Sequence, residues 1–297
     1  VPPLKVRLKK GAIQVVCKGR RYPPEQRDFM RRHVRELMDA GLAYMNRNAR
    51  WVSMPVVVKK SKPGEFRMIV DVVSEVNLQT ERLIWMMPNL EVVLDCVKGA
   101  RVFFSLDFFK GYWQFALHID SQEYFSFATE DGVVTPTRVL MGGSDSVAYC
   151  QSSVQRMFEK LYQKGLLIWL DDLLGYASDP MKLLDLITSV LEICEEFGLK
   201  LNPDKCDFYL EEALWCGKVV SGDGIKHDPA RVDALRNLPT PVNGAELLQF
   251  ICAFNWMRSS IPGYNKIVDP LMQVMERVYD KAGKRTKRGV KSVALAD

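Results

Sequence analysis

Three kinds of segment are missing from these 297 residues. No apolar run is long enough to cross a bilayer, which excludes a protein that spans a membrane by such a helix. The seven cysteines form no Cys-x-x-Cys pair, which argues against a disulfide framework or a zinc ribbon and suits a reducing compartment. The charged first residues lack the apolar stretch of a signal peptide, so we expect a protein that is intracellular and not secreted.

The composition that is present is that of a folded protein. Apolar residues make up 47% and charged residues 26%, so a core can be buried and wholesale disorder is excluded. The length exceeds one average domain and falls short of three large ones. The first residue is Val1, from which we expect a piece of a longer or processed chain.

Charge is distributed unevenly along the chain. Residues 1–33 hold 10 Lys and Arg against 2 Asp and Glu, and residues 271–297 hold 7 against 3, which leaves a net charge of −7 between them. Basic ends around an acidic middle fit a protein that grips a polyanion and gathers its carboxylates elsewhere. Solvated tails at the ends of a fragment explain the same charges equally well.

Local patterns predict mixed α/β structure as far as about residue 228 and helices after it. Residues 1–20 read as an extended arm, and two short apolar runs around a basic tip at 59–64 read as a hairpin. Helices are expected over 26–40, 90–98, 146–164, 181–197, 231–237, 245–258 and 269–281. Further strands are expected over 102–106, 113–119, 166–170, 173–174, 206–210 and 214–220.

Three carboxylates stand in stretches that otherwise favour burial. Asp171 and Asp172 interrupt the apolar run 167–174, and Asp107 lies among the aromatic residues of 103–109. Buried anions are costly unless they are paired or bind a metal. Mg²⁺ is suitable, because it takes one or two protein carboxylates together with substrate phosphates, and two such ions about 4 Å apart activate a hydroxyl and stabilise a leaving pyrophosphate. A polar hairpin tip and a strand end remain the plain alternative.

Ordered sequence blocks over residues 20–275 then make a resemblance specific. They are WVSMPVVVKKSKPGEFRMIVDVVSEVN, FSLDFFKGYWQFAL, IWLDDLLGYAS, GLKLNPDKCDF, LWCGKVVSGDGIKHDPARVDAL and LQFICAFNWMRSSIP. In order and spacing they resemble the reverse transcriptase of Ty3/gypsy-type LTR retrotransposon Pol polyproteins. The second block resembles the first catalytic block of that family, and the third its aromatic-x-Asp-Asp block.

The resemblance implies an α+β fold of the right-hand polymerase type, with fingers, a palm of antiparallel sheet backed by helices, and a helical thumb. Residues 1–20 would be an extended basic arm and 21–101 the fingers and the start of the palm. Residues 102–227 would be the palm with the Asp-Asp hairpin, with part of the fingers inserted near 120–145. Residues 228–297 would be the helical thumb and a basic tail.

The roles of single residues follow from the same resemblance. The catalytic and metal-binding carboxylates would be Asp107, Asp171 and Asp172. The deoxynucleotide would be held by Lys60, Arg67, Tyr112 and Lys205, with Tyr112 beneath the sugar and excluding a 2′-hydroxyl. Template and primer would be contacted by Met141, Gly142, Trp215, Cys216 and Gly217.

The implied activity is RNA-directed and DNA-directed DNA polymerisation, in which two Mg²⁺ ions, with Mn²⁺ as a substitute, add deoxynucleoside triphosphates to a primer 3′-hydroxyl. The expected partners are an RNA or DNA template with its primer, and no membrane. RNase H and integrase would lie elsewhere in the parent polyprotein. Replication of such an element takes place in a cytoplasmic particle, in the nucleus or in both.

Four features depart from the family pattern. Trp169 replaces the usual Tyr, Val73 replaces an Arg, Asn77 stands one residue late, and GGSDSVAYCQ replaces a Gly-Leu-Thr-Asn-Ala-Pro-like stretch. They keep open a second hypothesis, a decayed or domesticated remnant that binds nucleic acid without polymerising. A weaker third is a palm enzyme that uses no template, such as a nucleotide cyclase or a terminal transferase.

Overall fold

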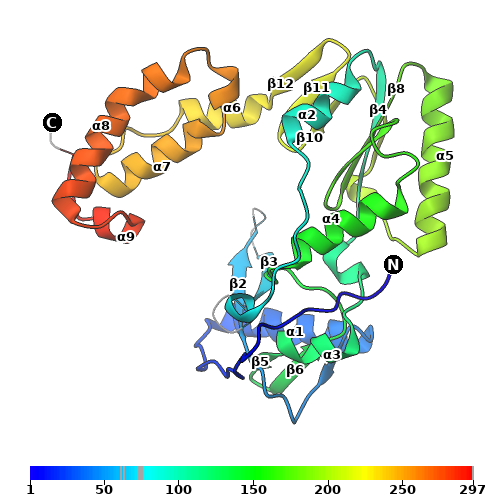
Figure 1. Cartoon of the computed structure of the whole chain (residues 1–297), viewed down its shortest axis with the longest axis vertical. Helices are drawn as coiled ribbons and strands as arrows, with labels where there is room; N and C mark the ends of the chain where they lie inside the picture. The colour runs from blue at the N-terminus through cyan, green and yellow to red at the C-terminus, as the bar shows by residue number, and fades with distance from the viewer. Residues whose placement is uncertain (61, 63, 73–75, 296–297) are drawn as a thin grey trace. The chain divides into compact units, whose positions relative to one another are not determined.

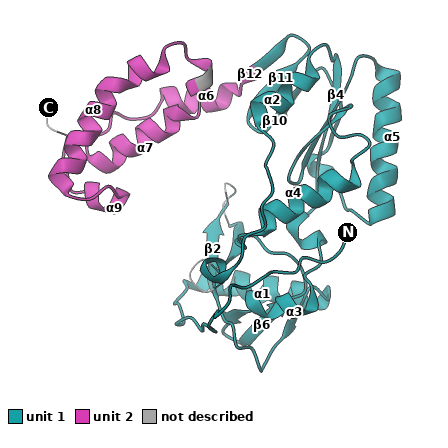
Figure 2. Ribbon diagram, in the orientation of Figure 1, with its two compact units in different colours: residues 1–225 teal, residues 226–297 magenta. Residues whose placement is uncertain are grey.

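The computed structural model describes residues 1–60, 62, 64–72 and 76–295, so Val73 lies outside the described residues. The chain divides into two compact units, residues 1–225 and residues 226–297 (Figure 2). The division falls close to residue 228, where the sequence predicts that the helical end begins. The names fingers, palm and thumb for these parts remain predictions.

The first helix and the first hairpin follow the sequence closely. Helix α1, Pro24–Asp39, begins at a proline, which suits the first helical turn, and it buries one face through Met30, Val34 and Leu37. Strands β2, Met54–Lys59, and β3, Phe66–Asp71, form the expected antiparallel hairpin.

A small sheet joins segments that are far apart in the sequence. Strand β1, Ala43–Met45, pairs with β6, Gly132–Pro136, which pairs in turn with β5, Phe127–Thr129. The chain between β4 and α4 therefore returns to the N-terminal elements (Figure 1). The assignment of part of 120–145 to the fingers stays a prediction.

The central sheet is antiparallel, and its order in the described chain is β7-β8-β4-β9. Its strands are β4, Val102–Asp107; β7, Leu166–Trp169; β8, Asp172–Ala177; and β9, Asp207–Leu210. Helix α4, Ser146–Met157, packs against β7, and helix α5, Pro180–Phe197, packs against β8 and β4 (Figure 1). The predicted α+β fold with a helix-backed antiparallel sheet is confirmed.

A second small sheet, of order β10-β11-β12, follows the central one. Its strands are β10, Glu212–Trp215; β11, Lys218–Ser221; and β12, Gly224–His227. Together with α2, Leu90–Leu94, and the 3-10 turn η2, Asp95–Val97, β10 and β11 enclose a separate apolar cluster around Trp215 and Phe103.

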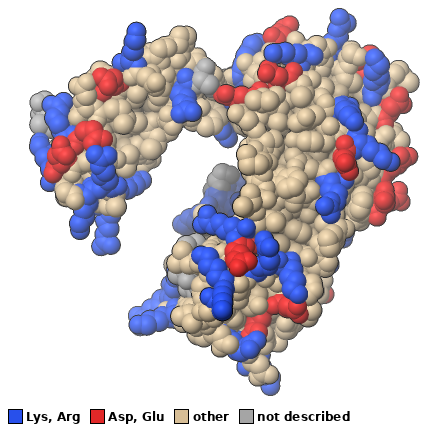
Figure 3. Space-filling model, viewed as in Figure 1, with Lys and Arg blue, Asp and Glu red and all other residues tan. Residues whose placement is uncertain are grey.

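The N-terminal arm is partly packed into the core. Leu4 and Val6 are buried, and Leu4 bridges to Leu117. The hydroxyl of Tyr149 donates to the carbonyl of Pro2 at 2.8 Å. The arm is therefore no freely solvated tail, although its lysines and arginines stay at the surface. In Figure 3, Lys and Arg side chains gather over the part of this unit that holds α1 and β2.

The second unit consists of helices around its own core. They are α6, Pro229–Arg236; α7, Gly244–Asn255; η6, Arg258–Ser260; α8, Tyr264–Ala282; and α9, Lys287–Val290. Side chains from α7, α8 and α9 form that core, including Ile251, Met275 and Val290. Part of the expected basic tail is thus helical and packed through the buried Val290.

Four expected elements are wrong in extent or kind. Residues 113–119 form no strand, because their backbone groups make only isolated bonds to two segments: Ala116 accepts from Leu4, whereas Leu117 donates to Thr137 and Phe115 accepts from Val139. They include part of the turn η3, Gly111–Gln114, and begin α3, Ile119–Gln122, which η4, Glu123–Phe125, follows.

The other three differ at their ends or at a turn. Helix α4 stops at Met157, because the fully buried Phe158 turns the chain into the core. The predicted strand 214–220 is the β10–β11 hairpin, which turns at Cys216 and Gly217. Helix α8 begins after Gly263 rather than at 269, and Pro270 lies inside it, so it loses one backbone hydrogen bond without ending there.

Candidate active site

The register of the central sheet brings the predicted carboxylates together. Asp107, the last residue of β4, lies opposite Asp172, the first residue of β8. Asp171 occupies the turn between β7 and β8, and its carbonyl accepts from the amide of Phe108 at 3.0 Å. Two strand ends and one turn thus place the three carboxylates at the same edge of the sheet.

Burial and mutual repulsion perturb these carboxylates. Burial raises the pKa of Asp172 to about 6, and the charges of Asp171 and Asp107 add to the effect. Burial also raises the pKa of Asp171, with a smaller contribution from Asp107. Such a group is stabilised in its charged form by a nearby cation.

Lys205 already supplies one cation. Its Nζ lies 2.8 Å from Oδ2 of Asp107, whose side chain is only 15% exposed. This hydrogen bond is the largest cause of the raised pKa of Lys205. The turn η5, Pro203–Lys205, is held close by the amide of Asn202, which donates to the carbonyl of Asp107 at 2.8 Å.

A cavity of about 420 Å³ opens beside this edge. Seven predicted residues line it: Lys60, Arg67, Asp107, Tyr112, Met141, Asp171 and Lys205. The lining combines cations, carboxylates and aromatic rings, which suits a ligand with phosphate groups and a flat ring. Asp172, Gly142 and the tip of the β10–β11 hairpin do not line the cavity.

Tyr112 forms part of the cavity floor. Its side chain is 8% exposed, and burial raises its pKa to about 12, so the phenol is neutral at physiological pH. The preceding Gly111 passes so close to the hairpin turn that a Cβ on it would lie 2.7 Å from Cβ of Asp171. Glycine is therefore required for the ring and the carboxylate to share this space.

The β2–β3 hairpin also supplies cations to the cavity lining. Arg67 pairs with Val58 in the hairpin register, and Lys60 follows directly after β2. Lys60 Nζ forms an ion pair with Glu65 at 3.2 Å. Both partners are about half exposed, so this pair is weak and can be exchanged for a phosphate.

Met141 and Gly142 lie at a turn that is fixed by Asn77. The side-chain Nδ2 of Asn77 donates to the carbonyl of Gly142 at 2.7 Å, and its Oδ1 accepts from the backbone amide of Ser144 at 2.8 Å. Gly142 has φ +110, and a Cβ there would lie 2.6 Å from the carbonyl oxygen of Val70. The late position of Asn77 is thus compatible with a structural role beside the cavity.

Trp215, Cys216 and Gly217 form the tip of the β10–β11 hairpin. Trp215 is buried, and its Nε1 has no hydrogen-bond partner among the described residues. Cys216 and Gly217 both have positive φ, 50° and 75°. The structure does not bring these three residues to the cavity, and their predicted role at the primer remains untested.

Sequence reasoning missed Lys110, which also lines the cavity. Its backbone is left-handed, with φ 49°, and its charge helps to lower the pKa of His33 on α1, which is mainly lowered by burial. The available signal was the Lys110-Gly111 pair inside the block that contains Asp107. Trp169, which replaces the usual Tyr, is partly buried and pairs with Asp172.

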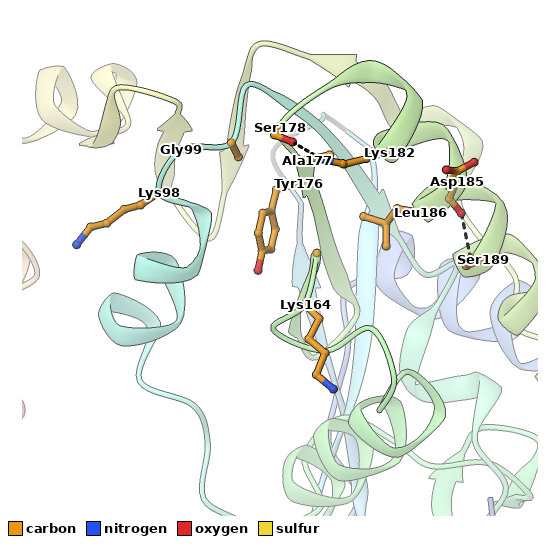
Figure 4. A pocket seen from close by; sticks show the side chains of 12 residues that line it. Lys98, Gly99, Lys164, Tyr176, Ala177, Ser178, Lys182, Asp185, Leu186 and Ser189 are labelled. Atoms are coloured by element: carbon orange, nitrogen blue, oxygen red, sulfur yellow. Dashed lines mark hydrogen bonds between the residues drawn. The ribbon is translucent and has the colours of Figure 1, made fainter.

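A larger hollow of about 570 Å³ lies at the other end of β8 (Figure 4). Lys98, Lys164 and Lys182 line it, and Lys182 donates to Ser178 at 3.2 Å. None of the predicted site residues lines this hollow. The chemistry of carboxylates and cations therefore points to the smaller cavity.

The donor set at the carboxylate edge fits magnesium. Within the described ranges, no group of three or more His, Cys, Asp or Glu residues is arranged as a complete metal cage. Mg²⁺ needs none, because it keeps several waters and uses one or two carboxylates plus substrate phosphates. The pKa of Asp171 is raised, and Asp107 is paired with Lys205. The carboxyl oxygens of both residues are hard ligands of the kind that Mg²⁺ prefers.

Comparison with known proteins then decides the family. Residues 58–239, more than half of the chain, match the family described as reverse transcriptase (RNA-dependent DNA polymerase). The chain belongs to the reverse transcriptase family. The resemblance predicted from the sequence blocks is confirmed.

The similar curated proteins are retroelement polyproteins. The chain is 26% identical over 249 residues to a retrovirus-related Pol polyprotein from transposon 297 of Drosophila melanogaster, covering 82% of this chain and 23% of that protein. It is 22% identical over 255 residues to the transposon Tf2-3 polyprotein of Schizosaccharomyces pombe, covering 86% and 19%. This reverse transcriptase chain thus spans about a fifth to a quarter of these relatives.

Solved structures agree on the fold. The foamy viral protease-reverse transcriptase in complex with an RNA/DNA hybrid superposes with a TM-score of 0.84 at 18% identity, covering 93% of this chain and 37% of that one. Its complex with double-stranded DNA gives 0.81 at 19% identity, covering 92% and 49%. In the described part of this reverse transcriptase chain, no helix is both long and apolar enough to cross a membrane.

Proposed function

We propose that this chain copies an RNA or DNA template by adding deoxynucleoside triphosphates to a primer 3′-hydroxyl. The observation that carries the proposal is the cavity that joins Asp107 and Asp171 to the cations Lys60, Arg67 and Lys205. In this arrangement the carboxylates would face the reacting oxygens, and the cations would face the triphosphate. Bound at Asp107, Asp171 and Asp172, two Mg²⁺ ions, or Mn²⁺ in their place, would activate the hydroxyl and stabilise the pyrophosphate.

The side chains contribute mainly by positioning and by charge. Arg67 and Lys60 approach from the β2–β3 hairpin and would hold the phosphates while the primer reacts. Lys205 lies within hydrogen-bonding distance of Asp107, so it would move to the phosphates once a metal ion neutralises that carboxylate. The Tyr112 ring would stand beside the sugar and exclude a 2′-hydroxyl by contact.

The nucleic acid would be held without regard to sequence. Lys and Arg side chains of the arm and of α1 lie at the surface and suit phosphate contacts, which give affinity and salt dependence rather than sequence preference. Met141, Gly142 and the tip at Trp215, Cys216 and Gly217 are proposed contacts for template and primer. We further propose that the protein acts inside the cell and that RNase H and integrase activities reside in other parts of its polyprotein.

Primer extension on matched RNA and DNA templates tests the proposal. We expect the parent chain to extend a primer with Mg²⁺ or Mn²⁺. Asp171→Asn and Asp107→Asn lose at least about 100-fold in rate but keep their affinity for the duplex, because the metal ligands act in the transition state. Asp207→Asn, on the exposed strand β9 of the same sheet, is the control and retains activity.

Two ion pairs bear on the alternative of a binding remnant. Asp107 is already paired with Lys205, and Lys60 with Glu65, so both must rearrange before catalysis. A parent chain that binds duplex with steep salt dependence yet extends no primer with either ion would establish the remnant instead. Extension of a primer without any template would point to a terminal transferase.

A further inference from the structure

The side chain of Gln151 connects helix α4 to the hairpin that carries the catalytic carboxylates. Gln151 is fully buried. Its Nε2 donates to the carbonyl of Ile168 at 3.1 Å, and its Oε1 accepts from the amide of Leu170 at 2.7 Å. One carboxamide thus satisfies two backbone groups, on either side of Trp169, at the end of strand β7.

The turn that it holds has a conformation that its own sequence disfavours. Trp169 pairs with Asp172, so Leu170 and Asp171 form a two-residue hairpin loop. Leu170 has φ 57°, where hairpins of this length usually carry Gly or Asn. A leucine with positive φ persists only where surrounding contacts fix it, and the hydrogen bond from its amide to Gln151 is such a contact.

Asp171 is therefore fixed from two directions. Gln151 holds the residue before it, and the amide of Phe108, at the end of β4, donates to the carbonyl of Asp171 at 3.0 Å. The bond to Phe108 sets the distance between Asp171 and the strand of Asp107. The bond to Gln151 sets the position of the loop relative to α4.

We propose that Gln151 is a positioning residue for the carboxylates of the β7–β8 hairpin. By fixing the backbone at Leu170, it keeps Asp171 and Asp172 aimed at the edge of the sheet where Asp107 ends. It contacts neither substrate nor metal. The inference rests on the proposed polymerase function, since it names what holds that site in shape.

Gln151→Met tests the proposal with Gln155→Met as its matched control. Methionine keeps the length of the side chain and removes both hydrogen bonds. Gln155 lies one turn further on the same helix and accepts from Nε1 of Trp85 at 3.1 Å, away from the hairpin. In Gln151→Met we expect kcat to fall at least about tenfold and the half-saturating Mg²⁺ concentration to rise, because small displacements of reacting groups cost large factors in rate.

The same variant must leave substrate binding alone. We expect its KM for deoxynucleotide and its affinity for duplex to stay within about twofold of the parent, because the cations that hold them lie on other elements. Gln155→Met keeps kcat, KM and the magnesium requirement of the parent. A kcat of Gln151→Met that stays within about twofold of the parent, in a folded protein, overturns the proposal.

Gln151→Asn covers the case in which the methionine variant unfolds. Asparagine keeps the carboxamide but is one methylene too short to reach both partners, so kcat again falls while KM is kept. If kcat and thermal stability fall in this variant while KM rises, Gln151 is only a part of the core and the proposal fails.

Hydrogen exchange separates this proposal from the polymerase proposal. The amide of Leu170 exchanges at least about tenfold faster in Gln151→Met than in the parent, while the amides of β4 keep their rates. An unchanged exchange rate at Leu170 refutes the positioning role of Gln151, whatever the activity of the variant. If the parent extends no primer but the exchange rate at Leu170 is increased in the variant, the polymerase function is refuted. The hydrogen bond from Leu170 to Gln151 is then still supported as the contact that fixes the hairpin.

Discussion

Replacing Asp172 by asparagine is expected to stabilise the metal-free protein while removing its activity. Burial raises the pKa of Asp172 to about 6 from an ordinary value of 3.8. The folded state therefore binds this proton more tightly than the unfolded state does. Ionisation takes stability away as the pH rises through the range from about 4 to 6, and the loss is complete above it.

The size of the effect follows from that difference. Each pKa unit corresponds to about 1.4 kcal/mol, which gives an upper limit of about 3 kcal/mol. Asp172 is only half-buried, so solvent screening reduces this to roughly 1–2 kcal/mol. For a unit of this length, about 2–4 °C of melting temperature corresponds to each kcal/mol, so we expect Asp172→Asn to melt about 2–8 °C higher at pH 8.

Thermal unfolding in EDTA, at pH 8 and at pH 4.5, measures this. The gain in melting temperature of Asp172→Asn over the parent is smaller at pH 4.5. At that pH the carboxyl of Asp172 is protonated in the folded parent, so the asparagine removes no buried charge. Asp207→Asn, at an exposed position of strand β9, serves as the control and gains nothing at either pH. A melting temperature of Asp172→Asn at pH 8 no higher than that of the parent, or an equal gain at both values, would refute the reasoning.

Substitutions at three further residues probe the cavity and the apolar cluster around Trp215. Tyr112→Val is expected to raise kcat/KM for ribonucleotides relative to deoxynucleotides, and an unchanged ratio in a folded, active variant leaves the ring without a role at the sugar. Gly111→Ala is expected to lower kcat at least about tenfold, because the added Cβ would lie 2.7 Å from Cβ of Asp171 and displace it. Full activity would mean that the β7–β8 hairpin can shift without loss of catalysis. Trp215→Phe costs about 1 kcal/mol, since Nε1 has no partner among the described residues, whereas Trp215→Ala costs about 3–5 kcal/mol; equal losses in urea unfolding would contradict this.

The carboxylate edge was predictable from the sequence for a physical reason. Asp107 and the pair Asp171 and Asp172 each end or interrupt an apolar run, and such runs pair as strands of a buried sheet. The register that sets Asp107 opposite Asp172 then follows from burial, because a slip of one residue would turn apolar side chains to the wrong face. The roles of the individual residues still rest on the family resemblance.

Long-range contacts were the part that could not be predicted. Residues 113–119 alternate like a strand and do bury Phe115 and Leu117, but their partners lie in two segments far apart in the sequence, at Leu4 and at residues 137–139. Gln151 looked like one more polar residue of a helix, and only the fold shows that it reaches Leu170. Lys110 became a cavity residue through its left-handed backbone, which no pattern of apolar residues indicates.

The packing of the N-terminal arm sets an order of events during synthesis. The arm leaves the ribosome before the segments that it contacts, because the amide of Leu4 donates to the carbonyl of Ala116 and the carbonyl of Pro2 accepts from the hydroxyl of Tyr149. At about 5–20 residues per second, the first of these partners, Ala116, appears roughly 6–22 s after Leu4. Leu4 and Val6 stay exposed during that interval. The arm therefore docks only after Ala116 has left the ribosome, and its apolar side chains need protection from aggregation until then.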